Sequence, residues 1–284
     1  MSLVPVEDLL RKAQEGDYAV GAFNCNNMEI VQAIVAAAEK ENAPVIMQAS
    51  QGAIKYAGLD YITAMAKLAA GKAKVPVALH LDHGTSFEQC IQCIRAGFSS
   101  VMIDGSKLPL QENIALTRRV LEVARACGVS VEAELGKIGG TEDDISVSER
   151  DALFTDPGEA DEFVRETGVG SLAVAIGTAH GQYKGVPELD FARLEKIIAL
   201  VKIPIVLHGS SGVPDEAVRK AISLGVCKVN IDTNIREAFV AAARKVLEEN
   251  LREIDPRKML GPAREAATEV IRDKIRIFGS SGKA

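Results

Sequence analysis

Tryptophan is absent from this sequence of 284 residues, and aromatic residues together make up only 4% of it. No window approaches the ~18 consecutive apolar residues of a membrane-spanning helix, and the start lacks the basic and apolar regions of a secretory signal. The net charge is −6 at pH 7, whereas nucleic acids and anionic membranes call for a basic surface. We therefore expect a cytoplasmic protein with neither a nucleic acid nor a membrane as its partner.

Cysteine is scarce and odd in number, with five residues scattered through apolar or helical segments. This usage favours reduced, buried thiols over a disulfide framework. Cys90 and Cys93 form a CxxC motif, but no second pair accompanies it and the segment is predicted to be helical. We interpret the motif as helix packing, not as a metal or redox site.

What the sequence does contain is a strict alternation of short β-rich runs and amphipathic helical stretches. The expected strands are Ala19–Phe23, Val45–Gln48, Val77–Leu81, Ser100–Ile103, Ser130–Glu134, Ser171–Ile176, Ile205–Leu207 and Lys228–Ile231. The expected helices between them are Glu29–Glu41, Tyr61–Gly71, Phe87–Ala96, Glu112–Cys127, Pro157–Glu166, Asp190–Val201 and Asp215–Leu224. Strict alternation requires right-handed parallel crossovers, and eight units close a (β/α)₈ TIM barrel.

We predict a single domain over residues 1–284, because no Pro/Ser-rich linker divides the chain. After the last strand, a helical extension covers about residues 234–277 with a break at Asp255–Pro256, and residues 278–284 look like a frayed tail. The longest interval between strands, from Ser130 to Ser171, is glycine-rich and then acidic without clear periodicity. Such an interval above a barrel is typical of a mobile lid or a disordered insertion.

Three of the four histidines share one context, in which an apolar run is followed by histidine and then glycine. They are His83 in LDHG, His180 in GTAHG and His208 in LHG. A parallel barrel collects its functional groups at the carboxyl ends of its strands, and three imidazoles with an open position describe a catalytic Zn²⁺ site. Any one of them alone could be an ordinary core or capping residue, but three in matched positions favour a metal.

Asp82 lies one residue before His83, on the same strand face as His80. A carboxylate beside a metal ligand can act as a general acid/base, although Asp82 could also serve as a helix N-cap. His80 lies deeper in the strand, and we expect it to be a hydrogen-bond partner behind the site instead of a ligand.

Asp104 and Glu134 end the fourth and fifth predicted strands, at the same rim as the three histidines. Two acids there suggest a second or alternative metal position. A loop cap, or a salt bridge to Lys107 or Lys137, explains them equally well.

Small residues follow the last two predicted strands, where barrels commonly bind phosphate through backbone N–H groups and hydroxyls. Lys184 and Arg236 add positively charged side chains near this rim, and the guanidinium group of Arg236 suits bidentate hydrogen bonding to a phosphate. The small and polar candidates are Gly209, Ser210, Ser211, Asn230, Asp232 and Thr233.

Together these motifs resemble the class II, metal-dependent ketose-bisphosphate aldolases over essentially the whole chain. The resemblance is carried by LDHG, VEAELG, the GG-x-EDD loop, GTAHG, LHGSSG, KVNIDTNIR and DPRKMLGPAREA. It implies a Zn²⁺ bound by His83, His180 and His208, with Asp82 as the proton donor. It further implies a second divalent position at Asp104 and Glu134, an acid/base role for Glu142 on the mobile loop, and a monovalent cation that could assist.

For the substrate, the resemblance implies that dihydroxyacetone phosphate contacts Gly181 and the two small-residue segments, with Asn24 and Ser50 also at the substrate. The expected reaction is reversible cleavage of fructose 1,6-bisphosphate, a sugar phosphate, into dihydroxyacetone phosphate and glyceraldehyde 3-phosphate. Tagatose-1,6-bisphosphate aldolase is the alternative, because it has the same machinery and differs at one stereocentre. The family also suggests a homodimer or homotetramer.

Three other classes fit the sequence less well. A Schiff-base aldolase needs a lysine near the carboxyl end of a strand, but Lys228 begins its strand and Lys184 lies in a loop. A zinc-hydroxide hydrolase barrel would lack its usual HxH on the first strand. A non-catalytic relative would have lost ligands, whereas the three histidines and Asp82 are all present.

Overall fold

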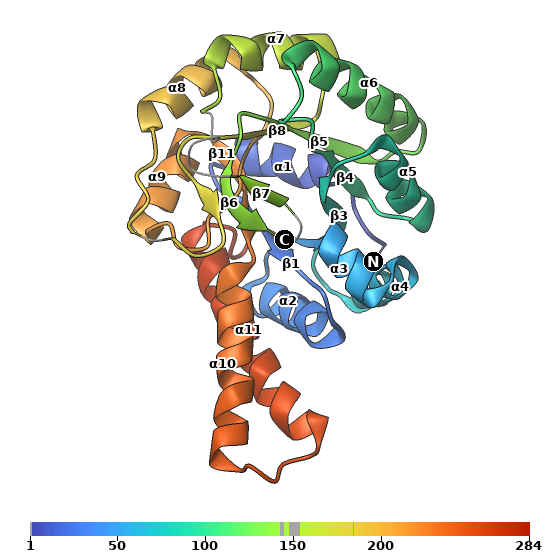
Figure 1. Ribbon diagram of the computed structural model, residues 1–284, viewed down its shortest axis with the longest axis vertical. Coiled ribbons are helices and arrows are strands. Elements are labelled where there is room, and N and C mark those ends of the chain that lie inside the picture. The colour runs from blue at the N-terminus through green and yellow to red at the C-terminus, as the bar shows by residue number, and fades with distance from the viewer. Residues whose placement is uncertain (1, 143–144, 148–153, 184) are drawn as a thin grey trace.

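The computed structural model describes residues 2–142, 145–147, 154–183 and 185–284, and its centre is a closed barrel of eight parallel strands (Figure 1). Around the barrel the strand order is β1-β11-β10-β8-β5-β4-β3-β2. The strands are β1 (Val20–Asn24), β2 (Val45–Ser50), β3 (Val77–Gly84), β4 (Ser100–Ile103), β5 (Ser130–Leu135), β8 (Ser171–Val174), β10 (Ile205–Leu207) and β11 (Val226–Ile231). All eight predicted strands are present, and the predicted (β/α)₈ TIM barrel is confirmed.

Helices surround the barrel and bury their apolar faces on its outer surface (Figure 1). They are α2 (Met28–Glu41), α3 (Gln51–Ala57), α4 (Leu59–Lys72), α5 (Phe87–Ala96), α6 (Leu110–Ala126), α7 (Pro157–Thr167), α8 (Phe191–Leu200) and α9 (Asp215–Leu224). The seven predicted helices are all found within one or two residues of their expected ends. The short helix α3 was not predicted, and it places Gln51 beside the end of β3.

A further helix that was not predicted, α1 (Val6–Glu15), closes the amino-terminal end of the barrel. Its buried residues Leu9 and Leu10 pack against Val20, Ile46 and Ala78, which lie low in the first three strands. This closure leaves the opposite rim, at the carboxyl ends of the strands, as the open face of the barrel.

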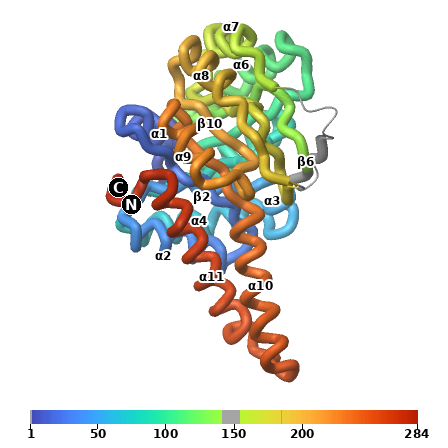
Figure 2. The backbone as a smooth tube through the Cα atoms, turned by 90° about the vertical axis from the view of Figure 1, so that its left-hand side faces the viewer, coloured from blue at the N-terminus to red at the C-terminus, as the bar shows by residue number. Residues whose placement is uncertain are grey.

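The predicted C-terminal extension consists of α10 (Thr233–Glu249) and α11 (Pro256–Ile277), which form a helical hairpin projecting from the barrel (Figures 1 and 2). The later part of α11 returns to the barrel and packs on α2 and β1. At the far end of the hairpin, Leu251 and Ile254 are 89% and 92% exposed.

The expectation of a frayed tail is wrong for residues 278–284. Phe278 is 1% exposed, and the backbone N–H groups of Gly282 and Ala284 donate to the carbonyls of Glu41 and Asn42 at the end of α2. Composition predicted fraying because the segment is rich in glycine and serine. The residues that bind this segment lie at the end of α2, more than 200 residues earlier in the sequence. The composition of the tail therefore gives no sign of them.

The long interval between β5 and β8 contains more structure than its sequence predicted. Residues of β6 (Gly139–Glu142) pair antiparallel with β7 (Ile145–Val147) and parallel with β9 (Ala179–His180). Gly140, at φ +94°, stands opposite His180, and a β-carbon at this position would lie only 2.1 Å from the carbonyl oxygen of His180. The strand β6 therefore lies directly on the segment that carries one of the candidate metal ligands.

Cys90 and Cys93 pack into the core, and burial raises the pKa of each thiol to about 12. This agrees with helix packing as the reason for the CxxC motif. Cys127 at the end of α6 departs from the expectation of buried thiols, because it is exposed. No helix among the described residues is long and apolar enough to cross a membrane.

Candidate metal centre and phosphate pocket

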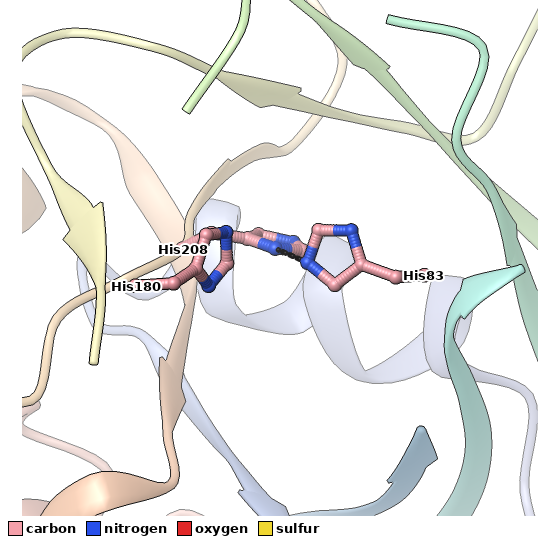
Figure 3. A group of neighbouring side chains, drawn as sticks. All are labelled: His83, His180 and His208. Atoms are coloured by element: carbon pink, nitrogen blue, oxygen red, sulfur yellow. Dashed lines mark hydrogen bonds between the residues drawn. The ribbon is translucent and has the colours of Figure 1, made fainter. Parts of the chain in front are cut away.

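The three predicted histidines meet above the open end of the barrel (Figure 3). His83 comes from the end of β3, His180 from β9, and His208 follows β10. One ring nitrogen from each lies within 4.8 Å of those of the other two, and all three side chains are buried. Strands that are far apart in the sequence thus deliver three imidazoles to one point.

A bulge at the end of β3 orients the side chain of His83. The pairing of β3 with β4 shifts register between Leu81 and Gly84, and His83 has a φ of +49°, which is uncommon for any residue other than glycine. The side-chain amide of Gln51 donates to the His83 carbonyl oxygen over 2.6 Å. His83 therefore lies within a distorted strand end and not just past it, and the distortion turns its ring toward the other two.

Hydrogen bonds to carboxylates set the tautomers of two of the rings. His208 Nε2 lies 2.8 Å from Glu132 Oε1, and His83 Nδ1 lies 3.3 Å from Asp104 Oδ2. A carboxylate can only accept, so these two nitrogens carry the hydrogens and the other nitrogen of each ring keeps its lone pair. Those lone-pair nitrogens, His208 Nδ1 and His83 Nε2, face each other at 2.9 Å. Converging imidazole lone pairs are the donor set that a divalent cation such as Zn²⁺ requires, so these residues fit a metal.

Ligand atoms of Asp104, Glu134 and His83 also lie within 4.8 Å of one another. Because His83 Nδ1 carries a hydrogen toward Asp104, the two carboxylates are the donors available to a second cation here. Glu134 Oε2 is 3.9 Å from His83 Nδ1, and burial, with the nearby Asp104 carboxylate, raises the pKa of Glu134 well above its ordinary value. Burial would also raise the pKa of Asp104, but hydrogen bonds from His83 and Ser106 bring it below its ordinary range. Two carboxylates with opposite pKa shifts mark a crowded acidic position, which a second cation would relieve.

Asp82 is fully buried, and amide groups from three strands hold it in place. Its Oδ2 accepts from Asn24 Nδ2 over 2.8 Å and from Gln48 Nε2 over 3.1 Å, while its Oδ1 accepts from Asn230 Nδ2 over 3.4 Å. The carboxylate does not cap the following helix, since Ser86 is the N-cap of α5. The capping alternative is therefore excluded, and Asp82 remains a carboxylate oriented beside the histidines.

An open pocket adjoins the histidines at the ends of β1, β10 and β11. It is lined by Asn24, His180, Gly181, Gly209, Ser210, Ser211, Asn230, Asp232, Thr233 and Arg236. The helix α10 begins in this lining at Thr233, so the positive end of its dipole lies at the pocket. Gly209 has a φ of +62°, and a β-carbon there would lie 2.6 Å from the Ala179 carbonyl oxygen. Small residues therefore let two loops approach closely around a space that suits an anion.

The remaining predicted residues have more varied placements. Arg236 pairs with Asp232 one helical turn earlier, at 2.6 Å. The Ser50 hydroxyl oxygen accepts from Ala53 N–H as the N-cap of α3, and Ser50 does not line the pocket. Glu142 belongs to β6 by its backbone, but its side chain lies outside the described residues, as does Lys184.

Several residues that organise the site were not predicted. Tyr183 accepts from Ala179 N–H at 2.6 Å and donates to the Gly209 carbonyl oxygen at 2.7 Å, so it ties the His180 segment to the Gly209 turn. Glu132 supports His208, and it could have been found, because it precedes Glu134 by two residues and so shares its strand face. The partners of Gln48 and Tyr183 lie on other elements, so no local pattern marks them.

Comparisons with known proteins agree with this geometry. The family model of class-II fructose-bisphosphate aldolase matches residues 4–283. The chain is 49% identical to a fructose-bisphosphate aldolase of Thermus caldophilus, over 99% of this chain and 100% of that protein. It is 50% identical to one of Geobacillus stearothermophilus, over 100% of this chain and 99% of that protein.

Solved structures show the same likeness. The crystal structure of the YdjI aldolase from Escherichia coli K12 superposes with a TM-score of 0.87 at 34% identity, covering 99% of each chain. A putative fructose-1,6-bisphosphate aldolase from Coccidioides immitis has a TM-score of 0.89 at 32% identity, covering 97% of this chain and 96% of that one. With the barrel, the three converging histidines and a match along almost its whole length, the chain belongs to the class-II fructose-bisphosphate aldolase family.

Proposed function

We infer that this protein catalyses the reversible aldol cleavage of fructose 1,6-bisphosphate to dihydroxyacetone phosphate and glyceraldehyde 3-phosphate. The observation that carries this inference is the convergence of the three histidines beside a pocket suited to phosphate, with the Asp82 carboxylate, one residue before His83, held by Asn24 and Asn230 of the pocket lining. The full-length identity of about half to two fructose-bisphosphate aldolases favours this substrate over tagatose 1,6-bisphosphate.

The proposed cofactor is one Zn²⁺ held by His83, His180 and His208. When bound, the metal supplies Lewis acidity, which stabilises the negative charge that develops on the substrate oxygens as the C3–C4 bond breaks. The carboxylates that hold the His83 and His208 rings support this assignment, and three protein ligands would leave a coordination position open for substrate. A second divalent ion at Asp104 and Glu134, and a monovalent cation beside the substrate, remain proposals.

Asp82 acts as the general base that takes the proton of the C4 hydroxyl in the cleavage direction and returns it in the condensation direction. Its carboxylate is buried and fixed by three amide donors, which supports this role because proton transfer requires an orientation within hydrogen-bond reach. Glu142 would handle the proton at C3 of the three-carbon fragment. Glu142→Ala tests this through exchange of the C3 hydrogen of dihydroxyacetone phosphate with solvent, and unchanged exchange would remove Glu142 from the mechanism.

The phosphate of dihydroxyacetone phosphate would occupy the pocket at Gly209, Ser210 and Ser211, with the start of α10 facing it. Backbone N–H groups, hydroxyls and a helix N-terminus are the usual partners of phosphate at this edge of a barrel. Gly181, Asn230, Asp232 and Thr233 line the same space, and Asn24 lies between it and Asp82. Lys184 and Ser50 are also proposed to contact the substrate, and Arg236 is proposed to contact the phosphate remote from the metal.

A coupled assay that compares fructose and tagatose bisphosphates, with and without a chelator, tests the proposed function. We expect preferential cleavage of fructose 1,6-bisphosphate, loss of activity with EDTA, and recovery on adding Zn²⁺. Borohydride with substrate should trap no lysine adduct. Chelator-resistant cleavage or a trapped lysine would overturn the metal-dependent mechanism, and faster turnover of the tagatose isomer would reassign the substrate.

A homodimer or homotetramer is also proposed. The exposed apolar residues Leu251 and Ile254, three positions apart at the end of the α10–α11 hairpin, are the proposed contact residues, since exposed apolar surface gathered at one place often marks a protein–protein interface. Sedimentation equilibrium should give two or four times the chain mass of 30.2 kDa. A monomer at micromolar concentration would contradict the proposal.

A further inference from the structure

A line of buried polar side chains crosses the interior of the barrel beneath the three histidines. Ser100 on β4, His80 on β3, Glu132 on β5 and Lys228 on β11 are each no more than 1% exposed. The strands β5 and β11 are not neighbours, because β8 and β10 lie between them. The contact of Lys228 with Glu132 therefore runs across the barrel interior and does not follow its wall.

The direction of each hydrogen bond follows from what the groups can donate. Lys228 Nζ lies 2.7 Å from Glu132 Oε2 and 3.4 Å from His80 Nε2. An ammonium group can only donate, so His80 Nε2 accepts and His80 Nδ1–H donates to Ser100 Oγ over 2.8 Å. On the other side, Glu132 uses Oε2 for Lys228 and Oε1 for His208 Nε2–H. Each of the two carboxylate oxygens of Glu132 thus accepts from one of these partners.

Stability alone does not account for a fully buried lysine here. Lysine is almost never fully buried unless it is paired, and a buried ion pair is often replaced by apolar residues of similar volume without loss of stability. What such a pair does provide is a fixed geometry. Removing one partner leaves the other charge buried and free to reorient toward any remaining donor.

We propose that Lys228 is a positioning residue for metal binding: it anchors Glu132 across the barrel so that Glu132 holds the His208 ring with Nδ1 toward His83. His80, which is itself hydrogen-bonded to Ser100, accepts from the same ammonium group. The inference rests on the proposed metal site and extends it, since the mechanism above uses neither Lys228 nor His80. It assigns to Lys228 a role in metal affinity and ligand orientation, and no contact with substrate.

The first test is the metal affinity of the purified full-length apoprotein carrying Lys228→Met, measured by competition with a chromogenic chelator for Zn²⁺. Loss of a partner that orients a ligand typically costs 10- to 100-fold in metal affinity, and we expect a loss of about that size here. The visible absorption of the Co²⁺-substituted variant should also change, because that spectrum reports ligand geometry. Val229→Ala is the matched control, since this neighbouring buried residue packs in the core and should lower the unfolding temperature while leaving the Zn²⁺ affinity unchanged.

A double-mutant comparison separates action through Glu132 from a general effect on the barrel. Lys228→Met combined with Glu132→Gln contains no unpaired charge at these two positions, so it should fold even where Lys228→Met alone does not. If Lys228 acts only through Glu132, the double variant should bind Zn²⁺ as tightly as Glu132→Gln alone. A further loss in the double variant, or unchanged affinity in folded Lys228→Met, would overturn the inference. Wild-type protein that binds no stoichiometric metal would instead overturn the metal site on which the inference depends.

Discussion

His208 Nδ1 lies 2.9 Å from His83 Nε2, although 125 residues separate the two in the chain. The outer nitrogen of each ring faces a carboxylate, from Glu132 and Asp104 respectively. The inner lone pairs of two neutral imidazoles repel each other unless a proton or a metal ion lies between them. The arrangement of the two histidines therefore favours a bound cation, and the first prediction tests metal binding.

The first prediction concerns loss of a metal ligand. His208→Ala should lower the bound Zn²⁺ together with the turnover rate, because it removes one of the three proposed protein ligands. Elemental analysis after dialysis, alongside the coupled assay, measures both quantities. A variant that keeps one equivalent of Zn²⁺ but loses activity would show that His208 serves another purpose.

The second prediction separates Asp82 from the ligands. Asp82→Ala should retain stoichiometric metal and bind dihydroxyacetone phosphate, yet lose on the order of 10²-fold or more in kcat, the usual contribution of one proton-transfer group. Metal content, ligand affinity and kcat are measured on one preparation. Loss of the metal in this variant would place Asp82 among the ligands.

The third prediction tests the Tyr183 bridge. Tyr183→Phe removes the hydroxyl that joins Ala179 N–H to the Gly209 carbonyl oxygen. An unsatisfied buried polar group costs about 1–3 kcal/mol, so we expect a loss of that size in the free energy of unfolding and weaker binding of inorganic phosphate. Urea unfolding and phosphate titration check the two effects, and the bridge has no role if both stay at the wild-type values.

The fourth prediction concerns the second phosphate. Arg236→Ala should weaken fructose 1,6-bisphosphate by roughly 1.5–3 kcal/mol, the size of a charged hydrogen bond, while barely changing the affinity for dihydroxyacetone phosphate. In the structure, Arg236 lines the same pocket as Ser210 and pairs with Asp232. Equal losses for both ligands would therefore assign Arg236 to the phosphate near the metal.

The fifth prediction tests the C-terminal tail. Phe278→Ala should lower the free energy of unfolding by about 3–5 kcal/mol, because Phe278 is 1% exposed and its removal leaves a cavity. Phe154→Ala is the matched control, since Phe154 is 47% exposed and mainly stacks with Arg193, a contact worth on the order of 1 kcal/mol. Similar losses in both variants would show that Phe278 is not part of the core.

The barrel and the residue types at its rim could be predicted from the amino-acid sequence alone. Short apolar runs alternating with amphipathic helices leave few topologies open, and the carboxyl ends of parallel strands necessarily meet at one edge. For this reason the convergence of His83, His180 and His208 could be predicted without any knowledge of distances.

The orientation of those residues and the side chains that support them became clear only from the three-dimensional arrangement of the strands. The bulge that turns His83, the Tyr183 bridge and the pairing of Lys228 with Glu132 across the barrel each depend on contacts with another element of the fold. The same holds for the tail, whose partners are Glu41 and Asn42. Local patterns report which face of an element is buried, whereas the choice of a hydrogen-bond partner inside a barrel depends on the three-dimensional register of all eight strands.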